Sequence, residues 1–362
     1  MINKPDIQRL LRKNVAQLTP YSSARDEFSS VAEVWLDANE NPFPSGFNRY
    51  PDPLQRKLKE TVAKFKKVNN ENLFIGNGSD EVLDLLFRAF CEPRLDNVVT
   101  IRPSYGMYQV LADVNDVQCR QAELNPDFSL DVEKLLELTD DYTKLILLCS
   151  PNNPTGNTFD AEAVNRLLEN TKAIVVLDEA YIDFSENSGF LAKLSRYPGL
   201  VIVQTLSKAW GMAALRLGLG FADEEIIRIL NSIKPPYNIN LLSQQEALKR
   251  LLNEKETLRQ IQMIRQEKEK MRRQLESLPV VKKVFPSDAN FLLVEINNAT
   301  DIYEKLIKKG IVVRNRSGLL HCYSCLRITI GTPKENERLL LELRNMTPLQ
   351  ASTPEASKIQ KR

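Results

Sequence analysis

The chain has 362 residues, with 49 Lys and Arg against 47 Asp and Glu, and it contains a single histidine. A net charge of +2 argues against a general nucleic-acid surface, which normally carries a clear basic excess. One histidine, His321, excludes sites that need several, such as three-histidine zinc centres. Chemistry near neutral pH therefore falls to Lys, Tyr, Asp, Glu or Cys. At roughly 150 residues per domain, this length predicts about two domains.

The cysteines favour a reducing compartment. They are odd in number and unevenly spaced, at Cys91, Cys119, Cys149, Cys322 and Cys325. This pattern is typical of free thiols rather than of a disulfide framework. The first residues lack the apolar core of a signal peptide, and no apolar run approaches the ~18 residues that a membrane span needs. We expect a cytoplasmic protein that binds neither membranes nor nucleic acid.

The first two thirds of the chain alternate between short apolar runs and amphipathic stretches. Residues 1–45 have weak periodicity, and we expect an N-terminal arm that contributes to a small domain; a helix follows at 53–68. Strands are expected at 73–75, 97–101, 145–149, 174–177 and 200–203, and helices at 81–90 and 161–170. Continuous Val, Ile and Leu runs separated by helices are typical of a parallel sheet covered on both faces. The fold class is therefore α/β, with a large domain at 46–240.

The last third has a different character. Residues 241–278 are helical in pattern and dense in charge, which predicts one connecting helix with a solvated face. A small α+β domain is expected at 279–348, with strands at 290–295, 311–313 and 326–330 and a helix at 302–309. Residues 349–362 are rich in Ser, Lys, Gln and Pro and are expected to form a flexible tail.

Two charged residues directly follow apolar strands. Asp178 ends the run 173–177, and Lys208 comes shortly after 200–203. Ligands of open α/β sheets bind at the carboxyl ends of the strands, so both side chains are placed for a site. A buried carboxylate needs a cation or donors, and a partly buried lysine can act as nucleophile or base. The plain alternatives are that Asp178 only caps the next segment and that Lys208 is a surface lysine.

Other residues at the same edge point to an anion. Arg216 lies in the apolar run 215–220, which we interpret as a strand, and a guanidinium there favours a buried phosphate. The glycine turn 76–78 leads into a helix at Ser79, and a helix N-terminus offers free N–H groups. Ser79 could also be a simple helix cap, and the turn lacks both the dinucleotide fingerprint and the P-loop lysine. An NAD-binding oxidoreductase is thereby disfavoured.

The order of these motifs resembles the fold-type I pyridoxal-phosphate enzymes, and the aminotransferase branch matches best. The motifs are NNPTG at 152–156, DEAY at 178–181 and SK followed by Arg at 207–216, within a resemblance that spans 21–331. The resemblance implies a mostly parallel seven-stranded sheet sandwiched by helices, plus a smaller α+β domain. It also implies pyridoxal 5′-phosphate as cofactor.

The resemblance assigns roles to residues of this chain. Lys208 would form the Schiff base with the cofactor and shuttle the proton, and Asp178 would pair with the pyridinium nitrogen. Asn153 and Tyr181 would bond the 3-oxygen of the ring, and Tyr105 would stack on it. The residues implied for the cofactor phosphate are Ser79 and Asp80 through their amides, Ser207 and Arg216.

Further segments resemble the histidinol-phosphate aminotransferase family: 18–25, 37–42, 49–53, 76–81 and 325–331. This implies reversible conversion of imidazole-acetol phosphate and L-glutamate into L-histidinol phosphate and 2-oxoglutarate, in histidine biosynthesis. Tyr21, Arg314 and Arg327 would bind the substrate phosphate, and Arg327 would also take the α-carboxylate of glutamate. Tyr50 would reach the cofactor phosphate of the neighbouring subunit in a homodimer.

Rival interpretations remain at this stage. A threonine-phosphate decarboxylase or an aromatic aminotransferase would share the fold, and a non-catalytic regulator would need a DNA-binding module for which residues 1–45 are too short and too neutral. The CxxC motif at 322–325 beside His321 has no second ligand pair, so no metal is expected. Glu179 and Asp183 are expected to face solvent or cap local turns, and Trp210 to influence packing beside Lys208.

Overall fold

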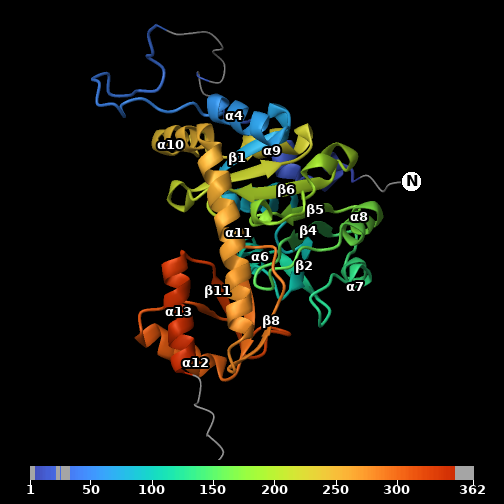
Figure 1. The fold of residues 1–362 in the computed structure, drawn as a ribbon. Helices are drawn as coiled ribbons and strands as arrows, with labels where there is room; N and C mark the ends of the chain where they lie inside the picture. The colour runs from blue at the N-terminus through green and yellow to red at the C-terminus, as the bar shows by residue number, and fades with distance from the viewer. Residues whose placement is uncertain (1–4, 22–24, 26–32, 347–362) are drawn as a thin grey trace, which may run out of the picture.

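The computed structural model describes residues 5–21, 25 and 33–346. These residues form a seven-stranded and a four-stranded β-sheet, which lie at the centres of a large and a small lobe (Figure 1). The strands of the large sheet are β1 (Leu73–Asn77), β2 (Asn97–Arg102), β3 (Gln118–Glu123), β4 (Thr143–Cys149), β5 (Ile174–Asp178), β6 (Leu200–Thr205) and β7 (Leu217–Phe221). Their order is β1-β7-β6-β5-β4-β2-β3.

The large sheet is mostly parallel, as the sequence predicts. Strands β3, β2, β4, β5 and β6 run parallel, whereas β7 is antiparallel to both β6 and β1. Strands β5, β6 and β7 are buried at every position, which explains their continuous apolar runs. The edge strand β3 was not predicted from the sequence, because its residues are mainly polar and half exposed.

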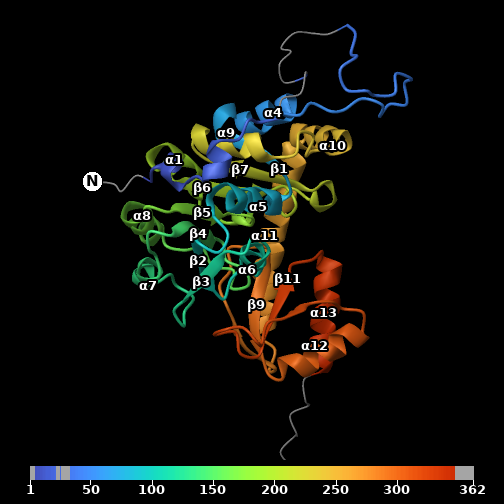
Figure 2. The same ribbon diagram turned by 180° about the vertical axis from the view of Figure 1, so that it is seen from behind.

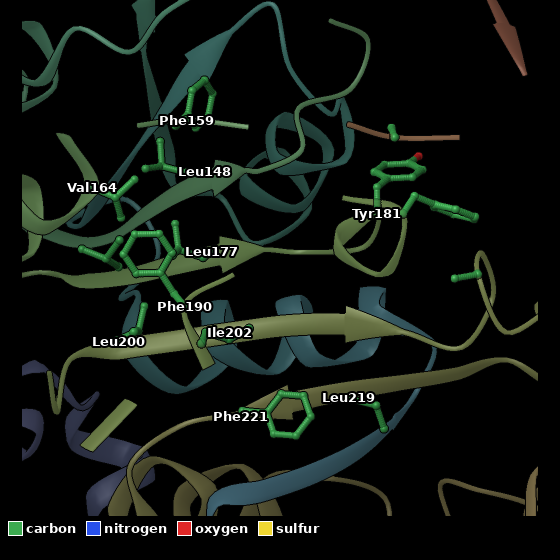
Figure 3. Packing of buried hydrophobic residues seen from close by; sticks show 14 of the residues in the cluster. Leu148, Phe159, Val164, Leu177, Tyr181, Phe190, Leu200, Ile202, Leu219 and Phe221 are labelled. Carbon is green, nitrogen blue, oxygen red and sulfur yellow. The ribbon is translucent and has the colours of Figure 1, made fainter. Parts of the chain in front are cut away.

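Helices cover both faces of this sheet. They are α4 (Arg56–Lys66), α5 (Ser79–Phe90), α6 (Met107–Val114), α7 (Val132–Glu137), α8 (Ala161–Asn170) and α9 (Glu224–Ile233), with 3₁₀ turns at Asn70–Asn72, Ile182–Phe184, Leu191–Arg196 and Ala213–Leu215. Helices α5, α6 and α9 share one core with the sheet, and α4, α7 and α8 share the other. In the second core, Val164 of α8 packs beside Leu148 and Leu177 on neighbouring strands (Figure 3).

The segment between the lobes forms two helices instead of the single one expected. Helix α10 (Leu241–Leu252) packs on the large lobe, and α11 (Glu254–Glu276) begins after Asn253. Asn253 has φ −106° and ψ 44°, outside the helical region, and asparagine is a weak helix former. The break was hidden because charged, helix-favouring residues flank it on both sides. Helix α11 then runs along both lobes (Figure 1).

The small lobe is built on an antiparallel sheet of order β10-β11-β9-β8. Its elements are β8 (Val281–Val284), β9 (Phe291–Ile296), α12 (Ala299–Lys308), β10 (Arg314–Asn315), β11 (Cys325–Thr329) and α13 (Pro333–Asn345). The strand expected at 311–313 is wrong, since Val312 is 79% exposed and pairing starts at Arg314. The α+β prediction itself is confirmed by these elements.

The N-terminal arm differs from expectation in its contacts. Helices α1 (Ile7–Leu10) and α2 (Lys13–Ala16) lie on the large lobe, where Ile7 enters the core around α5 and the Arg12 amide donates to the Ala89 carbonyl. Residues 33–50 extend away from the body on the side of α4 and α10, far from the small lobe (Figures 1 and 2). The predicted tail at 349–362 lies outside the described residues. No described helix is long and apolar enough to cross a bilayer.

Candidate active site

A pocket opens at the carboxyl ends of β4, β5 and β6, where ligands of such sheets bind. Its lining residues are Ser79, Asp80, Tyr105, Cys149, Asn153, Asp178, Ala180, Tyr181, Thr205, Ser207, Lys208 and Arg216. Nine of the ten residues that the sequence predicts as cofactor contacts are among them, and Tyr50 is the exception. Cys149, Ala180 and Thr205 were missed, although each lies within or beside a motif already recognised.

Asp178 is the last residue of β5 and is buried at the floor of the pocket. Its Oδ2 accepts a 3.0 Å hydrogen bond from the Tyr108 hydroxyl, and its Oδ1 accepts one of 3.1 Å from the Ala180 amide. Burial raises the pKa of Asp178 to about 6, although both hydrogen bonds oppose the shift. Among the described residues Asp178 has no ion-pair partner, so its carboxylate is suited to a cationic group entering the pocket. Tyr108, on α6, was not foreseen.

Lys208 follows β6 and reaches the open part of the pocket. Its Nζ lies 5.7 Å from the centroid of the Tyr181 ring. Although solvent reaches the side chain, the surrounding protein lowers the pKa of Lys208, first through desolvation and then through the charge of Arg327. A lysine with a lowered pKa has more of the neutral amine that can act as a nucleophile or base.

One end of the pocket is shaped for an anion. Gly78 has φ +81°, and a Cβ there would lie 2.6 Å from Nη2 of Arg216. A Cβ on Gly218 would lie 2.2 Å from the backbone nitrogen of Ser79. Only glycine therefore lets the start of α5 approach β7 and Arg216 this closely. The amides at this helix start, the Arg216 guanidinium and the Ser207 hydroxyl form a donor set for phosphate.

Two details of the anion end differ from the sequence interpretation. Arg216 does not lie inside a strand: it precedes β7, and its φ is +53°. The Asp80 carboxylate accepts a 3.2 Å hydrogen bond from the Tyr105 hydroxyl and lies 3.8 Å from Nη2 of Arg216. Because a carboxylate repels phosphate, only the backbone amide of Asp80 is suited to the anion.

Hydrogen bonds join the pocket to the small lobe. Nη1 of Arg327 on β11 donates to Oδ1 of Asn153, and Nδ2 of Asn153 donates to the Tyr181 hydroxyl at 3.4 Å. The Arg327 guanidinium also lies over the Phe291 ring, 5.2 Å from its centroid. Burial lowers the pKa of Arg327. Arg314 is the register partner of Arg327 in the small sheet, so both side chains lie on the same face.

The remaining predicted residues lie outside the pocket of this chain. Tyr21 is on the arm and 74% exposed. Tyr50 stacks on Tyr237 with ring centroids 4.4 Å apart, beside a separate hollow between the arm and α10. A single chain therefore brings Arg314 and Arg327 together but brings neither tyrosine to them.

The two acidic neighbours of Asp178, Glu179 and Asp183, were expected to face solvent or to cap local turns, but both form contacts with distant parts of the chain. Glu179 is buried and accepts hydrogen bonds from the Phe190 amide at 2.7 Å and from Gln204 Nε2 at 2.9 Å. Burial raises the pKa of Glu179 to about 7. Asp183 accepts a 3.1 Å hydrogen bond from Nε1 of the buried Trp210 and pairs with Lys66. These contacts hold the loop that carries Tyr181 and support the turn around Lys208.

The CxxC pair has no metal-site geometry around it. Cys322 and Cys325 are buried free thiols. Burial raises the pKa of Cys322 to about 11 and that of Cys325 to about 12, which disfavours the thiolate that metals bind. Within the described ranges, no group of three or more His, Cys, Asp or Glu side chains is arranged to hold a metal ion.

Comparison with known proteins agrees with this geometry. The family model for aminotransferase class I and II matches residues 21–343. The chain belongs to this family. A histidinol-phosphate aminotransferase of Parabacteroides distasonis is 56% identical over 94% of this chain and 99% of its own length. Within the family, the chain therefore belongs to the histidinol-phosphate aminotransferases. A crystal structure of the Clostridium acetobutylicum histidinol-phosphate aminotransferase matches with a TM-score of 0.76 at 25% identity, over 83% of this chain and 91% of that one.

The cofactor of this transaminase family is pyridoxal 5′-phosphate, and the pocket fits it. A Sinorhizobium meliloti histidinol-phosphate aminotransferase solved in complex with this cofactor shares the fold, with a TM-score of 0.76 at 22% identity over 85% of this chain and 89% of that one. The unpaired buried carboxylate of Asp178 suits a protonated ring nitrogen, and the glycine-shaped cradle at Gly78 suits the phosphate. Lys208 lines the same pocket and has an amine of lowered pKa.

Proposed function

We propose that this enzyme interconverts imidazole-acetol phosphate and L-histidinol phosphate in histidine biosynthesis, with L-glutamate and 2-oxoglutarate as the second pair of reactants. The observation that carries the proposal is the pairing of Arg314 and Arg327 on one face of the small sheet. In the described part of the chain neither arginine pairs with an acidic residue, so both are available to an anionic substrate. Guanidinium groups match the geometry of phosphate oxygens.

The proposed mechanism assigns one task to each end of the pocket. When bound, pyridoxal 5′-phosphate supplies an electron-withdrawing ring that stabilises negative charge on the substrate α-carbon. Asp178 would hold a proton on the ring nitrogen, and Lys208 would act as the base that takes and returns the proton at the substrate α-carbon. Asn153 and Tyr181 would bind the 3-oxygen of the ring, and Tyr105 would stack on it. Ser79, Asp80, Ser207 and Arg216 would hold the phosphate.

Both reactants of this ping-pong reaction use the same cleft. Arg327 binds the α-carboxylate of glutamate in one half-reaction and the phosphate of the second substrate in the other. Arg314 and Tyr21 complete the phosphate site. The link from Arg327 through Asn153 to Tyr181 connects substrate binding to the ring position, because all three side chains are joined by hydrogen bonds.

The arm supports a homodimer with shared active sites. Its exposed large apolar side chains include Val34, Leu36, Phe43 and Phe47. Exposed apolar side chains clustered on one extended segment are typical of an interaction surface. In the proposed dimer the arm lies on the second copy, where Tyr50 reaches the cofactor phosphate of the partner. The five free cysteines favour a location in the reducing cytoplasm.

A half-reaction experiment tests the substrate. The cofactor-loaded enzyme is mixed separately with histidinol phosphate, histidinol, phenylalanine and glutamate, and the loss of the visible absorption of the lysine-bound cofactor is followed. Histidinol phosphate and glutamate should remove the absorption, whereas histidinol should be much slower. Reaction with histidinol but not with its phosphate would overturn the proposed substrate. Release of carbon dioxide from threonine phosphate would instead identify the decarboxylase of the same fold.

A further inference from the structure

A third arginine, Arg316, lies next to the arginine pair on the small sheet. Its amide donates a 2.8 Å hydrogen bond to the Cys325 carbonyl, which continues by one step the ladder that pairs Arg314 with Arg327. Its carbonyl accepts a 2.9 Å hydrogen bond from the Leu319 amide. Both the amide and the carbonyl of Arg316 therefore form backbone hydrogen bonds, which fix the position of its Cα and the direction in which its side chain leaves the backbone.

Alternation along the strands shows which way this side chain faces. Residues two apart on a strand share a face, so Arg314 and Arg316 lie on the face that carries Cys325 and Arg327. Cys325 is buried in the core cluster that also contains Tyr181 of the large lobe. The intervening Leu326 is buried in the separate core of the small lobe. The face with the three arginines is thus the one turned toward the large lobe and its pocket.

The three positive charges are not neutralised within the described residues. None of Arg314, Arg316 and Arg327 forms a salt bridge there, and the buried Nε atoms of Arg316 and Arg327 have no hydrogen-bond partner. Burial lowers the pKa of Arg316, and the charges of Arg327 and Arg314 lower it further. Like charges and unsatisfied buried donors both destabilise a protein, and a bound anion with several oxygens removes both costs.

We propose that Arg316 is a specificity-determining residue that binds the substrate phosphate together with Arg314 and Arg327. The inference rests on the proposed phosphate-ester substrate and extends it. A phosphate monoester carries between one and two negative charges and three acceptor oxygens, whereas a carboxylate carries one charge and two oxygens. A third guanidinium therefore favours the phosphate over the carboxylate of glutamate, which shares Arg327.

The test compares half-reactions of the cofactor-loaded Arg316→Gln enzyme with those of the wild type. The substrate concentration for half-maximal rate should rise about tenfold or more for histidinol phosphate, the scale of one lost charge-assisted hydrogen bond. For glutamate it should change by less than about twofold, with the maximal rate retained. The matched control is Ser317→Ala, because the neighbouring Ser317 lines a separate hollow beside the start of α12, and this variant should leave both substrates unaffected.

Two outcomes would overturn the role of Arg316: an equal loss for both substrates, as from general structural damage, or no loss for histidinol phosphate. Should Arg316→Gln fail to fold, Arg316→Lys is assayed with inorganic phosphate as a competitor of histidinol phosphate. Inhibition should then be several-fold weaker than in the wild type, and unchanged inhibition refutes the inference. Failure of the proposed function would be distinguishable from failure of the Arg316 inference. In that case the wild type itself would react with histidinol as readily as with histidinol phosphate.

Discussion

The Tyr108 hydroxyl donates a 3.0 Å hydrogen bond to Oδ2 of Asp178, so a buried carboxylate at the end of β5 is supported by a buried residue of α6. This bond stabilises the ionised form of Asp178 against the effect of burial, which raises its pKa to about 6. The ionised form is the one that can pair with a protonated ring nitrogen. In the proposed mechanism Tyr108 thus acts on the cofactor through Asp178 and is a positioning residue.

Replacing Tyr108 with Phe should therefore weaken catalysis without removing the cofactor. A hydrogen bond to a charged group contributes about 1.5–3 kcal/mol, so the pKa of Asp178 should rise by about one to two units. We expect kcat to fall about tenfold and the pH profile of kcat to shift to higher pH. Tyr197→Phe is the matched control, because this buried tyrosine donates to Glu169 away from the pocket. Equal pH profiles for the two variants would contradict the role of Tyr108.

A second prediction concerns the stability of the cofactor-free protein. The pKa of Asp178 is about 6 in the folded state against an ordinary value of 3.8. A raised pKa contributes stability at pH values below about 4, and this contribution is lost as the pH rises through 6. At pH 8 the wild type holds an ionised carboxylate that burial disfavours, and Asp178→Asn does not. The variant should be inactive and yet melt a few degrees higher than the wild type at pH 8, with a smaller difference at pH 5.

Thermal melts of both proteins without cofactor check this prediction. Asp183→Asn serves as a control, because it removes an acidic partner of Lys66 and Trp210 and should lower the melting temperature at both pH values. A wild type that is more stable than Asp178→Asn at pH 8 would show that burial does not penalise this carboxylate.

Much of the fold and the site could be predicted because the informative residues are adjacent in sequence. Strands buried on both faces are continuous apolar runs, and each site motif directly follows such a strand. Relationships across long separations could not be predicted in this way. Tyr108 and Asp178 are 70 residues apart, and the sequence of neither segment predicts the hydrogen bond between them. The polar edge strand β3 lacks the apolar pattern of its neighbours, and so it was missed.

The arginines of the small sheet illustrate the same limit. Arg314 and Arg327 were predicted from the resemblance to a family, whereas the orientation of Arg316 depends on the register between β10 and β11. A shift of one residue would turn all these side chains to the other face. This register is set by the packing of Leu326 and Ile328 into the small-lobe core. Local sequence motifs carry no information about such packing.

A third prediction concerns the phosphate cradle. A methyl group on Gly78 would meet Arg216, and a positive φ of 81° disfavours alanine in any case. We expect Gly78→Ala to weaken the binding of pyridoxal 5′-phosphate about tenfold or more, measured by titration of the cofactor-free protein. Gly310→Ala is the control for backbone strain alone. Gly310 also has a positive φ, of +75°, but no atom lies within 4 Å of its added Cβ. If both variants lost cofactor affinity equally, the cradle at Gly78 would have no special role.

The last prediction tests the proposed sharing of active sites between two subunits by mixing two defective variants. Tyr50→Ala should bind the cofactor weakly, and Lys208→Ala should not turn over at all. In a mixed dimer, one site combines an intact Lys208 with Tyr50 from the other subunit, and the second site lacks both. Random mixing makes half of the dimers mixed, so about one quarter of the sites should become active at limiting cofactor. If Tyr50 served its own chain, no site would contain both residues and mixing would restore no activity.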